Sequence, residues 1–330
     1  MTDALDNTML SFFVEHSHIR AFAETKVNLK REDVRDFRAQ VNRLRDRLEE
    51  YIKEHPDYGL VKMLHAGSVM KGTALKTVND MDVAVYVRPS DETTDENRLL
   101  SWLTSRLHEV YPTMKPEQFI RRDHCVTVSF AGSGLDVDVV PVIAEEDAKD
   151  YGWLVVKNTG ERVRTSIPLH LEFIRTRKNA ASTHFAQVVR LLKWWVRQRK
   201  SDDTSFRFKS FMVELICAKL ADGGLDCSDY RRALERAFTY VVTTGLTERI
   251  VFTDYYDSDA AASSNAPIQI FDPVNPDNNV AAKYTDTERR AIVEAAADAL
   301  DAITEAHYAT SQGRAIAMWK VVLGPTFTLN

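Results

Sequence analysis

The sequence predicts an α+β protein in which a sheet lobe is followed by a helical lobe, with a cleft between the two. Residues 31–54 repeat apolar positions at the period of a long helix. Residues 60–143 change to short β-branched runs that are typical of strands. From residue 166 onward the pattern is almost wholly helical. For a chain of 330 residues we expect one large two-lobed unit or two domains, and we place the boundary between residues 1–165 and 166–330.

Composition excludes several classes of protein. The chain has 43 Lys and Arg against 48 Asp and Glu, a net charge of −5, which does not favour a dedicated nucleic-acid binder but leaves one open, since local basic clusters matter more than the sum. No run approaches the roughly 20 apolar residues of a membrane span, and the first residues lack a secretion-signal pattern. The three cysteines have no CxxC spacing, so a disulfide framework or a structural zinc site is not expected. These features predict a cytoplasmic protein without membrane contact.

The first strong element is a helix from about Arg31 to about Glu54. Its apolar residues recur every 3.6 positions, and the opposite face is densely charged. A helix of this length is typical of a coiled-coil arm or of a spine across a two-lobed protein. The apolar face consists of Val34, Phe37, Val41, Leu44, Leu48, Tyr51 and Ile52.

Three strands and one helix are predicted in the rest of the first lobe. The strands are Met81–Val87, Val126–Phe130 and Leu135–Val142, which are β-branched and partly alternating. A helix over about 94–111 separates the first strand from the other two. This mixture of strands and helices indicates an α/β or α+β sheet.

The second lobe is predicted to consist of helices joined by loops. Residues 257–279 form a long polar stretch interrupted by a short apolar run, and structured loops of this length are more often functional than accidental. The helices are expected over about 166–178, 182–200, 208–221, 228–243 and 285–309.

Acidic residues follow a spacing that is suited to metal binding. Asp80 and Asp82 are two residues apart, so on a strand both side chains point to one face, about 7 Å apart. The strand that contains Asp136 and Asp138 offers a further carboxylate. Three acidic groups from two neighbouring strands would form a two-metal site for displacement at phosphorus.

A Gly-Ser turn precedes these carboxylates. Gly67 would let backbone N–H groups approach a phosphate, and Ser68 can cap a following helix and donate a hydrogen bond. Taken alone, a Gly-Ser pair is usually only a turn, and an Asp-x-Asp pair is usually a solvated strand end. In this order and spacing, with an Asp-Val-Val-Pro strand downstream, the combination is far more specific.

The pattern Gly-Ser, then Asp-Met-Asp, then Asp-Val-Val-Pro resembles the polymerase β-type nucleotidyltransferases. Within them the chain is similar to the cGAS/DncV-like enzymes (CD-NTases) of bacterial CBASS anti-phage signalling, relatives of oligoadenylate synthetase. The likeness continues through the segments RLLKW, FKSFMVE and DPVNPDNN of the helical half. Segments such as KVNLKREDV, SGLDVDVVPV and SIPLHLEFI look most like clade C of that family. The resemblance covers nearly the whole chain.

The resemblance implies roles for the acidic residues and for the turn. Asp80 and Asp82 match the family's two metal-binding carboxylates, and Asp138 matches the third catalytic, metal-binding carboxylate. Asp136, on the same strand face, is a reserve candidate. Gly67 and Ser68 match the phosphate-binding turn.

The resemblance also implies nucleotide-binding residues in the helical lobe. Lys193 and Ser210 match a pair that holds the donor triphosphate, and Phe211 matches an aromatic residue that stacks on the donor base. The family often has Tyr at this last position, so the phenolic hydroxyl is missing here. On their own chemistry, Lys193 is typical of a surface lysine with a buried stem and Phe211 of a core residue.

The activity implied is Mg²⁺-dependent, with Mn²⁺ as a substitute, and uses ATP, with other NTPs as further substrates. The fold implied is a polymerase β-like sheet lobe with a spine helix and an oligoadenylate-synthetase-like helical lobe. Such an enzyme would join NTPs into a cyclic oligonucleotide second messenger, with cyclic triadenylate favoured. Its partners would be a HORMA-domain activator and, through the messenger, a downstream effector. A linear nucleotidyltransferase acting on RNA, a small molecule or a protein would use the same metal site. A catalytically dead binding module is disfavoured because the acidic set is complete.

Basic residues cluster on the predicted helices of the second lobe. Such clusters are usually solvated faces, but relatives in clade C are thought to respond to double-stranded DNA, so a phosphate-backbone groove is a second expectation. The residues are Arg190, Lys193, Arg197, Arg199, Lys200, Arg207 and Lys209, and then Arg231, Arg232 and Arg236.

Overall fold

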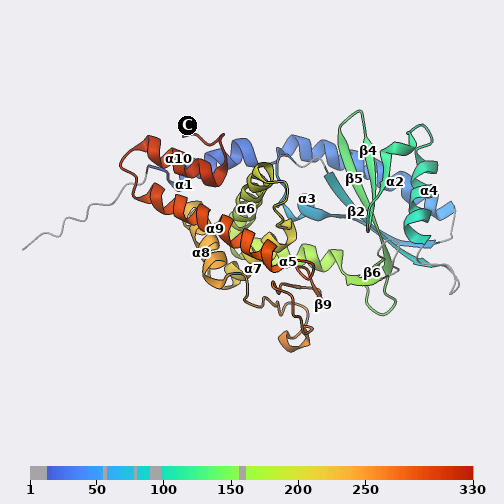
Figure 1. Cartoon of the computed structure of the whole chain (residues 1–330). Coiled ribbons are helices and arrows are strands. Elements are labelled where there is room, and N and C mark those ends of the chain that lie inside the picture. The colour runs from blue at the N-terminus through green and yellow to red at the C-terminus, as the bar shows by residue number, and fades with distance from the viewer. Residues whose placement is uncertain (1–12, 55–57, 78–79, 90–97, 156–160, 330) are drawn as a thin grey trace, which may run out of the picture.

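The computed structural model describes residues 13–54, 58–77, 80–89, 98–155 and 161–329. It has a sheet lobe at one end and a helical lobe at the other (Figure 1). The predicted α+β architecture of two lobes is confirmed. Within the described residues, no helix combines the length and the apolar character needed to cross a bilayer.

The sheet of the first lobe has the strand order β1-β2-β5-β4-β3, with β6 pairing to β5 and β7 to β6. Strands β2 and β5 run parallel, and the other pairs are antiparallel. The strands are β1 Tyr58–Ala66, β2 Asp80–Pro89, β3 Phe119–Arg121, β4 Val126–Phe130, β5 Leu135–Ala144, β6 Gly152–Val155 and β7 Arg162–Thr165.

Three helices accompany the sheet: α2 Arg31–Glu54, α3 Gly67–Lys71 and α4 Leu99–Val110. The predicted long helix is confirmed at both ends, and it buries an apolar stripe of Val41, Leu44, Leu48 and Ile52 in one core with the sheet. Helix α4 begins at Leu99, and the first four residues of the expected 94–111 helix lie outside the described residues.

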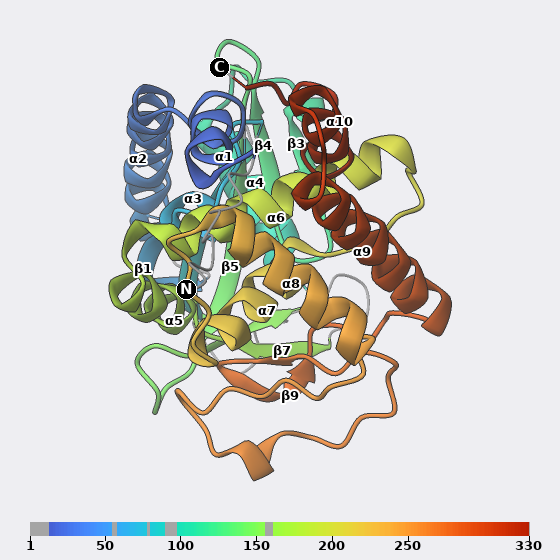
Figure 2. The same cartoon turned by 90° about the vertical axis from the view of Figure 1, so that its left-hand side faces the viewer.

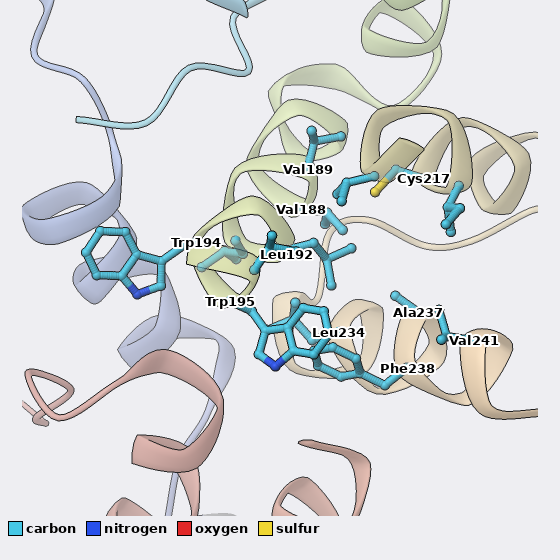
Figure 3. Packing of buried hydrophobic residues seen from close by; sticks show 14 of the residues in the cluster. Val188, Val189, Leu192, Trp194, Trp195, Cys217, Leu234, Ala237, Phe238 and Val241 are labelled. Carbon is cyan, nitrogen blue, oxygen red and sulfur yellow. The ribbon is translucent and has the colours of Figure 1, made fainter. Parts of the chain in front are cut away.

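The second lobe gathers its helices around a separate hydrophobic core. In Figure 3, Trp195 on α6 points toward Phe238 on α8, with ring centroids 4.9 Å apart, whereas Trp194 points to the other side of α6. Trp194 meets Phe22 there, at 6.0 Å between ring centroids. The helices are α5 Ile167–Ala180, α6 Ser182–Asp202, α7 Ser210–Asp222, α8 Tyr230–Thr244, α9 Asp286–His307 and α10 Gln312–Leu323.

The N-terminal segment belongs to this second core. Helix α1 His16–Phe22 and the π-helical turn Ala23–Val27 pack among the residues of the helical lobe, and α2 then continues into the sheet lobe. The chain from α1 to α2 therefore spans both lobes, as a spine does. Packing thus associates the segment Val14–Val27 with the lobe that we assigned to residues 166–330.

The expected loop 257–279 contains regular structure. It holds a 3-10 turn, Ser258–Ala260, and a hairpin of β8 Phe271–Asp272 with β9 Asn275–Asn279. In Figure 2 this hairpin lies below α7 and α8, and the loop that carries the 3-10 turn extends below the hairpin to the lower edge of the molecule. The predicted strand Val126–Phe130 keeps its bounds, and the other two predicted strands lengthen by two or three residues. Strands β1, β3, β6 and β7 and helix α10 were not predicted. Strand β1 (YGLVKMLHA) has few β-branched residues and no clean alternation, so it lacks the usual strand signal.

Candidate active site

Parallel pairing of β2 and β5 brings the acidic residues together. Asp80 lies opposite Asp136, and Asp82 lies opposite Asp138. Successive strand residues alternate between faces, so these four side chains share one face while Met81 and Val137 point into the core. The Asp-x-Asp spacing on each strand places the carboxylates on the less buried face of the sheet.

The pKa values of two of these carboxylates are raised by burial and by the negative charges of their neighbours. Burial raises the pKa of Asp82 to about 6, and the negative charges of Asp80 and Asp138 add to the effect. The pKa of Asp80 is also raised, chiefly by burial, with further repulsion from Asp138 and Asp136. Like charges at close range disfavour joint ionisation. The fold therefore holds these groups close despite their repulsion.

Asp138 and Asp82 are each held by a neighbour. Thr127 on β4 lies opposite Asp138 and donates its hydroxyl to Asp138 Oδ1 at 2.6 Å. The Asp82 carboxylate lies against the Cα of Gly67, where any added Cβ would collide with it. Gly67 also has a φ of 70°, a left-handed conformation that favours glycine. The Gly67–Ser68 turn and the carboxylate face are thus in direct contact.

The chemistry of these residues fits a divalent cation. Carboxylate oxygens are the ligands that Mg²⁺ and Mn²⁺ prefer, and three of them converge here from neighbouring strands. Among the described residues, however, no three His, Cys, Asp or Glu side chains are yet gathered closely enough to hold a metal ion. The assignment of Asp80, Asp82 and Asp138 as metal ligands therefore stays a prediction, one that requires the carboxylates to turn toward one another.

Helix α3 begins at Gly67 and ends at Lys71, and the Gly72 that caps it has a φ of 73°. Ser68 lies in its first turn, and its carbonyl accepts a hydrogen bond from the Thr73 backbone N–H at 2.9 Å. The turn is therefore a short, closed loop between β1 and the start of β2. Its role in holding phosphates remains a prediction.

Lys193 is buried and not a surface lysine. Its ammonium lies 2.6 Å from Glu214 Oε1 and donates to the Thr73 side chain at 3.2 Å. The other oxygen of Glu214 lies 2.8 Å from the ammonium of Lys71, and Thr73 donates to Glu214 at 2.6 Å. Lys193, Glu214, Lys71 and Thr73 form one group, here called the lysine–glutamate network, at the junction of the lobes.

Ser210 and Phe211 begin α7 beside this network. Lys193 and Ser210 both line a hollow of about 600 Å³, whose lining also includes Leu75 and Thr77 from the loop before β2. Phe211 is partly buried against the helical core, and the Lys71 ammonium lies 4.8 Å above its ring. The structure thus brings Lys193, Ser210 and Phe211 together where the lobes meet. The three carboxylates do not line this hollow.

Sequence reasoning missed Lys71, Thr73 and Glu214. A signal for Glu214 was present, because it is a single acidic residue inside the apolar run Met-Val-Glu-Leu-Ile-Cys of a buried helix. Lys71 and Thr73 carried no such signal, since a Lys-Gly-Thr sequence after a turn is typical of solvent-exposed chain.

The structure corrects the predicted basic surface. Lys193 and Arg231 are buried, and Arg190 is directed inward to the carbonyl of Gly72 and the side chain of Asn28. These three residues cannot contribute to a nucleic-acid groove. Arg197 and Lys200 at the end of α6 are exposed and stay candidates.

Three comparisons identify relatives of the chain. Residues 15–165 match the family model described as Second Messenger Oligonucleotide or Dinucleotide Synthetase domain. The chain is 49% identical over 314 residues to cyclic AMP-AMP-AMP synthase of Escherichia coli (strain MS 115-1), covering 95% of this chain and 98% of the relative.

Solved structures agree. That of E. coli MS115-1 CdnC with ATP superposes with a TM-score of 0.88 at 48% identity, over 96% of this chain and 99% of the other. The CdnC:HORMA-deltaN complex superposes with a TM-score of 0.87 at the same identity and coverage. The chain therefore belongs to the CD-NTases, the nucleotidyltransferase family of CBASS oligonucleotide cyclases.

Proposed function

We propose that this protein converts ATP into cyclic triadenylate, a second messenger of anti-phage defence. The observation that carries the proposal is the β2–β5 register, which sets Asp80 and Asp82 beside Asp138 on one face, in contact with the Gly67 turn. The relative of 49% identity named cyclic AMP-AMP-AMP synthase supports the choice of product.

The reaction is attack of an acceptor 3′-oxygen on the α-phosphorus of a donor ATP. The new O–P bond forms as the bond between the α-phosphorus and its bridging oxygen breaks, and pyrophosphate leaves. Two such steps give a linear trinucleotide, and a third, within one molecule, closes the ring. Three ATP molecules thus yield one cyclic triadenylate and three pyrophosphates.

Asp80, Asp82 and Asp138 would hold the divalent cations, Mg²⁺ or Mn²⁺. When bound, these ions supply acidification of the 3′-hydroxyl and neutralisation of the leaving phosphates. The carboxylate nearest the 3′-oxygen accepts its proton. The Thr127 hydrogen bond fixes the orientation of Asp138.

The remaining residues bind and orient the donor. Gly67 and Ser68 hold the β- and γ-phosphates through backbone N–H groups and the serine hydroxyl. Lys193 and Ser210 contact the triphosphate from the helical lobe, and Phe211 stacks on the donor base. Holding donor and acceptor in one geometry makes the attack effectively unimolecular.

A HORMA-domain protein is proposed as an activating partner, and a nuclease-type effector as the receiver of the messenger, all in the cytoplasm. The CdnC:HORMA-deltaN complex of the E. coli relative supports the first of these. Double-stranded DNA is proposed to bind the exposed end of α6. Neutralising Arg197, Arg199 and Lys200 together should weaken DNA binding and flatten its salt dependence, and an unchanged salt dependence would remove this surface.

The test is incubation of the purified protein with labelled ATP, and with each other NTP, in the presence of Mg²⁺. The HORMA protein and duplex DNA are each included and omitted, and products are resolved by mass. A phosphatase-resistant cyclic product that is lost in the Asp80→Ala/Asp82→Ala variant is expected. Linear, phosphatase-sensitive products would instead establish a linear nucleotidyltransferase.

A further inference from the structure

Glu214 is a buried carboxylate that forms ion pairs with two lysines from different parts of the chain. Its side chain is 3% exposed, and its two oxygens lie 2.8 Å from Lys71 and 2.6 Å from Lys193. Lys71 ends α3, the helix of the Gly-Ser turn, whereas Lys193 lies on α6 and Glu214 on α7. One carboxylate thus sets the spacing of two ammonium groups across the junction of the lobes.

The network carries a net positive charge. Two ammonium groups share one carboxylate, and the Thr73 hydroxyl, which also donates to Glu214, is neutral. A buried ion pair is seldom the most stable way to fill a core, because desolvation opposes it. Whatever the network contributes to the fold, its one cation in excess remains available to receive an anion.

The excess charge lies between the two halves of the proposed donor site. Lys71 is three residues beyond Ser68 and lies 4.8 Å above the ring of Phe211. Lys193 lines the same hollow as Ser210. A triphosphate that reaches from the Ser68 turn to Ser210 passes this pair of ammonium groups.

We propose that Lys71 is a second phosphate-binding lysine beside Lys193, and that Glu214 is the positioning residue that holds the two ammonium groups as a pair. This inference rests on the proposed function, because it assigns the pair to the donor triphosphate of ATP. Glu214 acts through the lysines and does not itself touch the nucleotide. Its carboxylate contacts both ammonium groups and so fixes their spacing beside the turn that would hold the phosphates.

The decisive variant is Lys71→Met, which removes one cation and leaves the Lys193–Glu214 pair intact. Calorimetric titration with ATP and with adenosine, which has no phosphates, compares it with wild type. We expect the affinity for ATP to fall about tenfold or more and that for adenosine to change less than about twofold. Lys71→Arg, which keeps the charge, should restore most of the loss.

Exposed residues supply a matched control. Lys53 forms a Lys–Glu pair of the same 2.8 Å length with Glu49, on the solvent-exposed face of α2. Lys53→Met should leave both affinities unchanged. If Lys71→Met likewise left ATP affinity within twofold of wild type, or weakened ATP and adenosine equally, Lys71 would not be a phosphate ligand.

The role of Glu214 is tested by a double-mutant cycle with Glu214→Gln. Because Glu214 acts through the lysines, the loss of ATP affinity in Lys71→Met/Glu214→Gln should be clearly smaller than the two single losses combined. In steady state each single variant should raise KM for ATP with kcat within about threefold. Additive losses, or a fall in kcat alone, would overturn the positioning role.

If Glu214→Gln does not fold, the Lys71 titrations still decide whether Lys71 binds phosphate. Because these titrations need no turnover, they also separate this inference from the proposed function. A wild-type enzyme that binds ATP through Lys71 but makes only linear products would refute cyclisation and leave the lysine pair standing.

Discussion

Asp82 on the β2–β5 face and Glu214 at the junction of the lobes have pKa values shifted in opposite directions. On the β2–β5 face, burial and the neighbouring Asp80 and Asp138 charges raise the pKa of Asp82 to about 6. In the lysine–glutamate network, burial alone would raise the pKa of Glu214, but Lys71 and Lys193 outweigh it and lower the pKa to about 2. Burial raises the pKa of both carboxyl groups, so the charge of the neighbours decides whether the net shift is upward or downward.

The difference separates two uses of an acidic residue. Repelling carboxylates add nothing to stability, and a fold keeps them close where they serve chemistry. A carboxylate matched by two cations stabilises its surroundings and fixes their geometry. A substitution of Asp82 should therefore lower activity more than stability, whereas a substitution of Glu214 should lower stability most.

The largest effect is expected from Asp82→Ala. It should lower product formation about 10³-fold or more, because a metal-binding carboxylate is lost. Metal-free stability should stay equal or rise, because a repelling charge is removed. Product analysis and thermal unfolding in EDTA measure both quantities. If the variant were inactive because it is unfolded, Asp82 would be needed for the fold, which would contradict its assignment to chemistry alone.

Glu214→Ala should have the opposite balance. It leaves the ammonium groups of Lys71 and Lys193 buried without their counter-ion, so the free energy of unfolding should fall by about 3–5 kcal/mol. Urea unfolding measures this, with Glu49→Ala as the exposed control, expected within about 0.5 kcal/mol of wild type. A loss below about 1 kcal/mol would mean that the network contributes little to the fold.

Gly67→Ala tests the contact between the turn and the carboxylate face. The added Cβ would collide with Asp82 and also strain a φ of 70°, so we expect about 2–3 kcal/mol of destabilisation. Gly134→Ala is the control, because Gly134 has a similar φ of 67° but no atom within 4 Å of a Cβ. Gly134→Ala should cost only about 1 kcal/mol. Equal losses, compared by urea unfolding, would show that the close approach to Asp82 has no consequence.

The smallest effect concerns pH. A carboxyl whose pKa is raised in the folded state binds its proton more tightly there, so its ionisation destabilises the fold as pH rises through about 6. Metal-free stability should therefore be higher at pH 5.5 than at pH 7.5, by about 1 kcal/mol after allowance for solvent screening.

Asp82→Asn should flatten that dependence when urea unfolding is followed in EDTA. Glu214 has the opposite sign: its contribution is complete above pH 4.5 and is lost only as pH falls toward 2. Between pH 5.5 and 7.5 the stability should therefore change through Asp82 and not through Glu214. A wild-type profile that is flat between pH 5.5 and 7.5 would argue against a raised pKa for Asp82.

Local periodicity was sufficient for much of the fold and for part of the site. The helix Arg31–Glu54 and the strand Val126–Phe130 have the bounds that the sequence predicts, because their apolar periods are clean. The Asp-x-Asp spacing placed Asp80 and Asp82 on one face for the same reason. Strand β1 was missed because it has no clean alternation.

What the sequence by itself determined is the elements with a clean apolar period and the face on which each acidic residue lies, since both follow from the repeat of a helix or a strand. Only the tertiary structure decided which faces meet. Tertiary packing set the register of β2 on β5, buried Lys193, and paired it with Lys71 through Glu214. These contacts join residues up to 143 positions apart. Such contacts depend on how lobes and helices pack, and no local period encodes the partner of a buried charge.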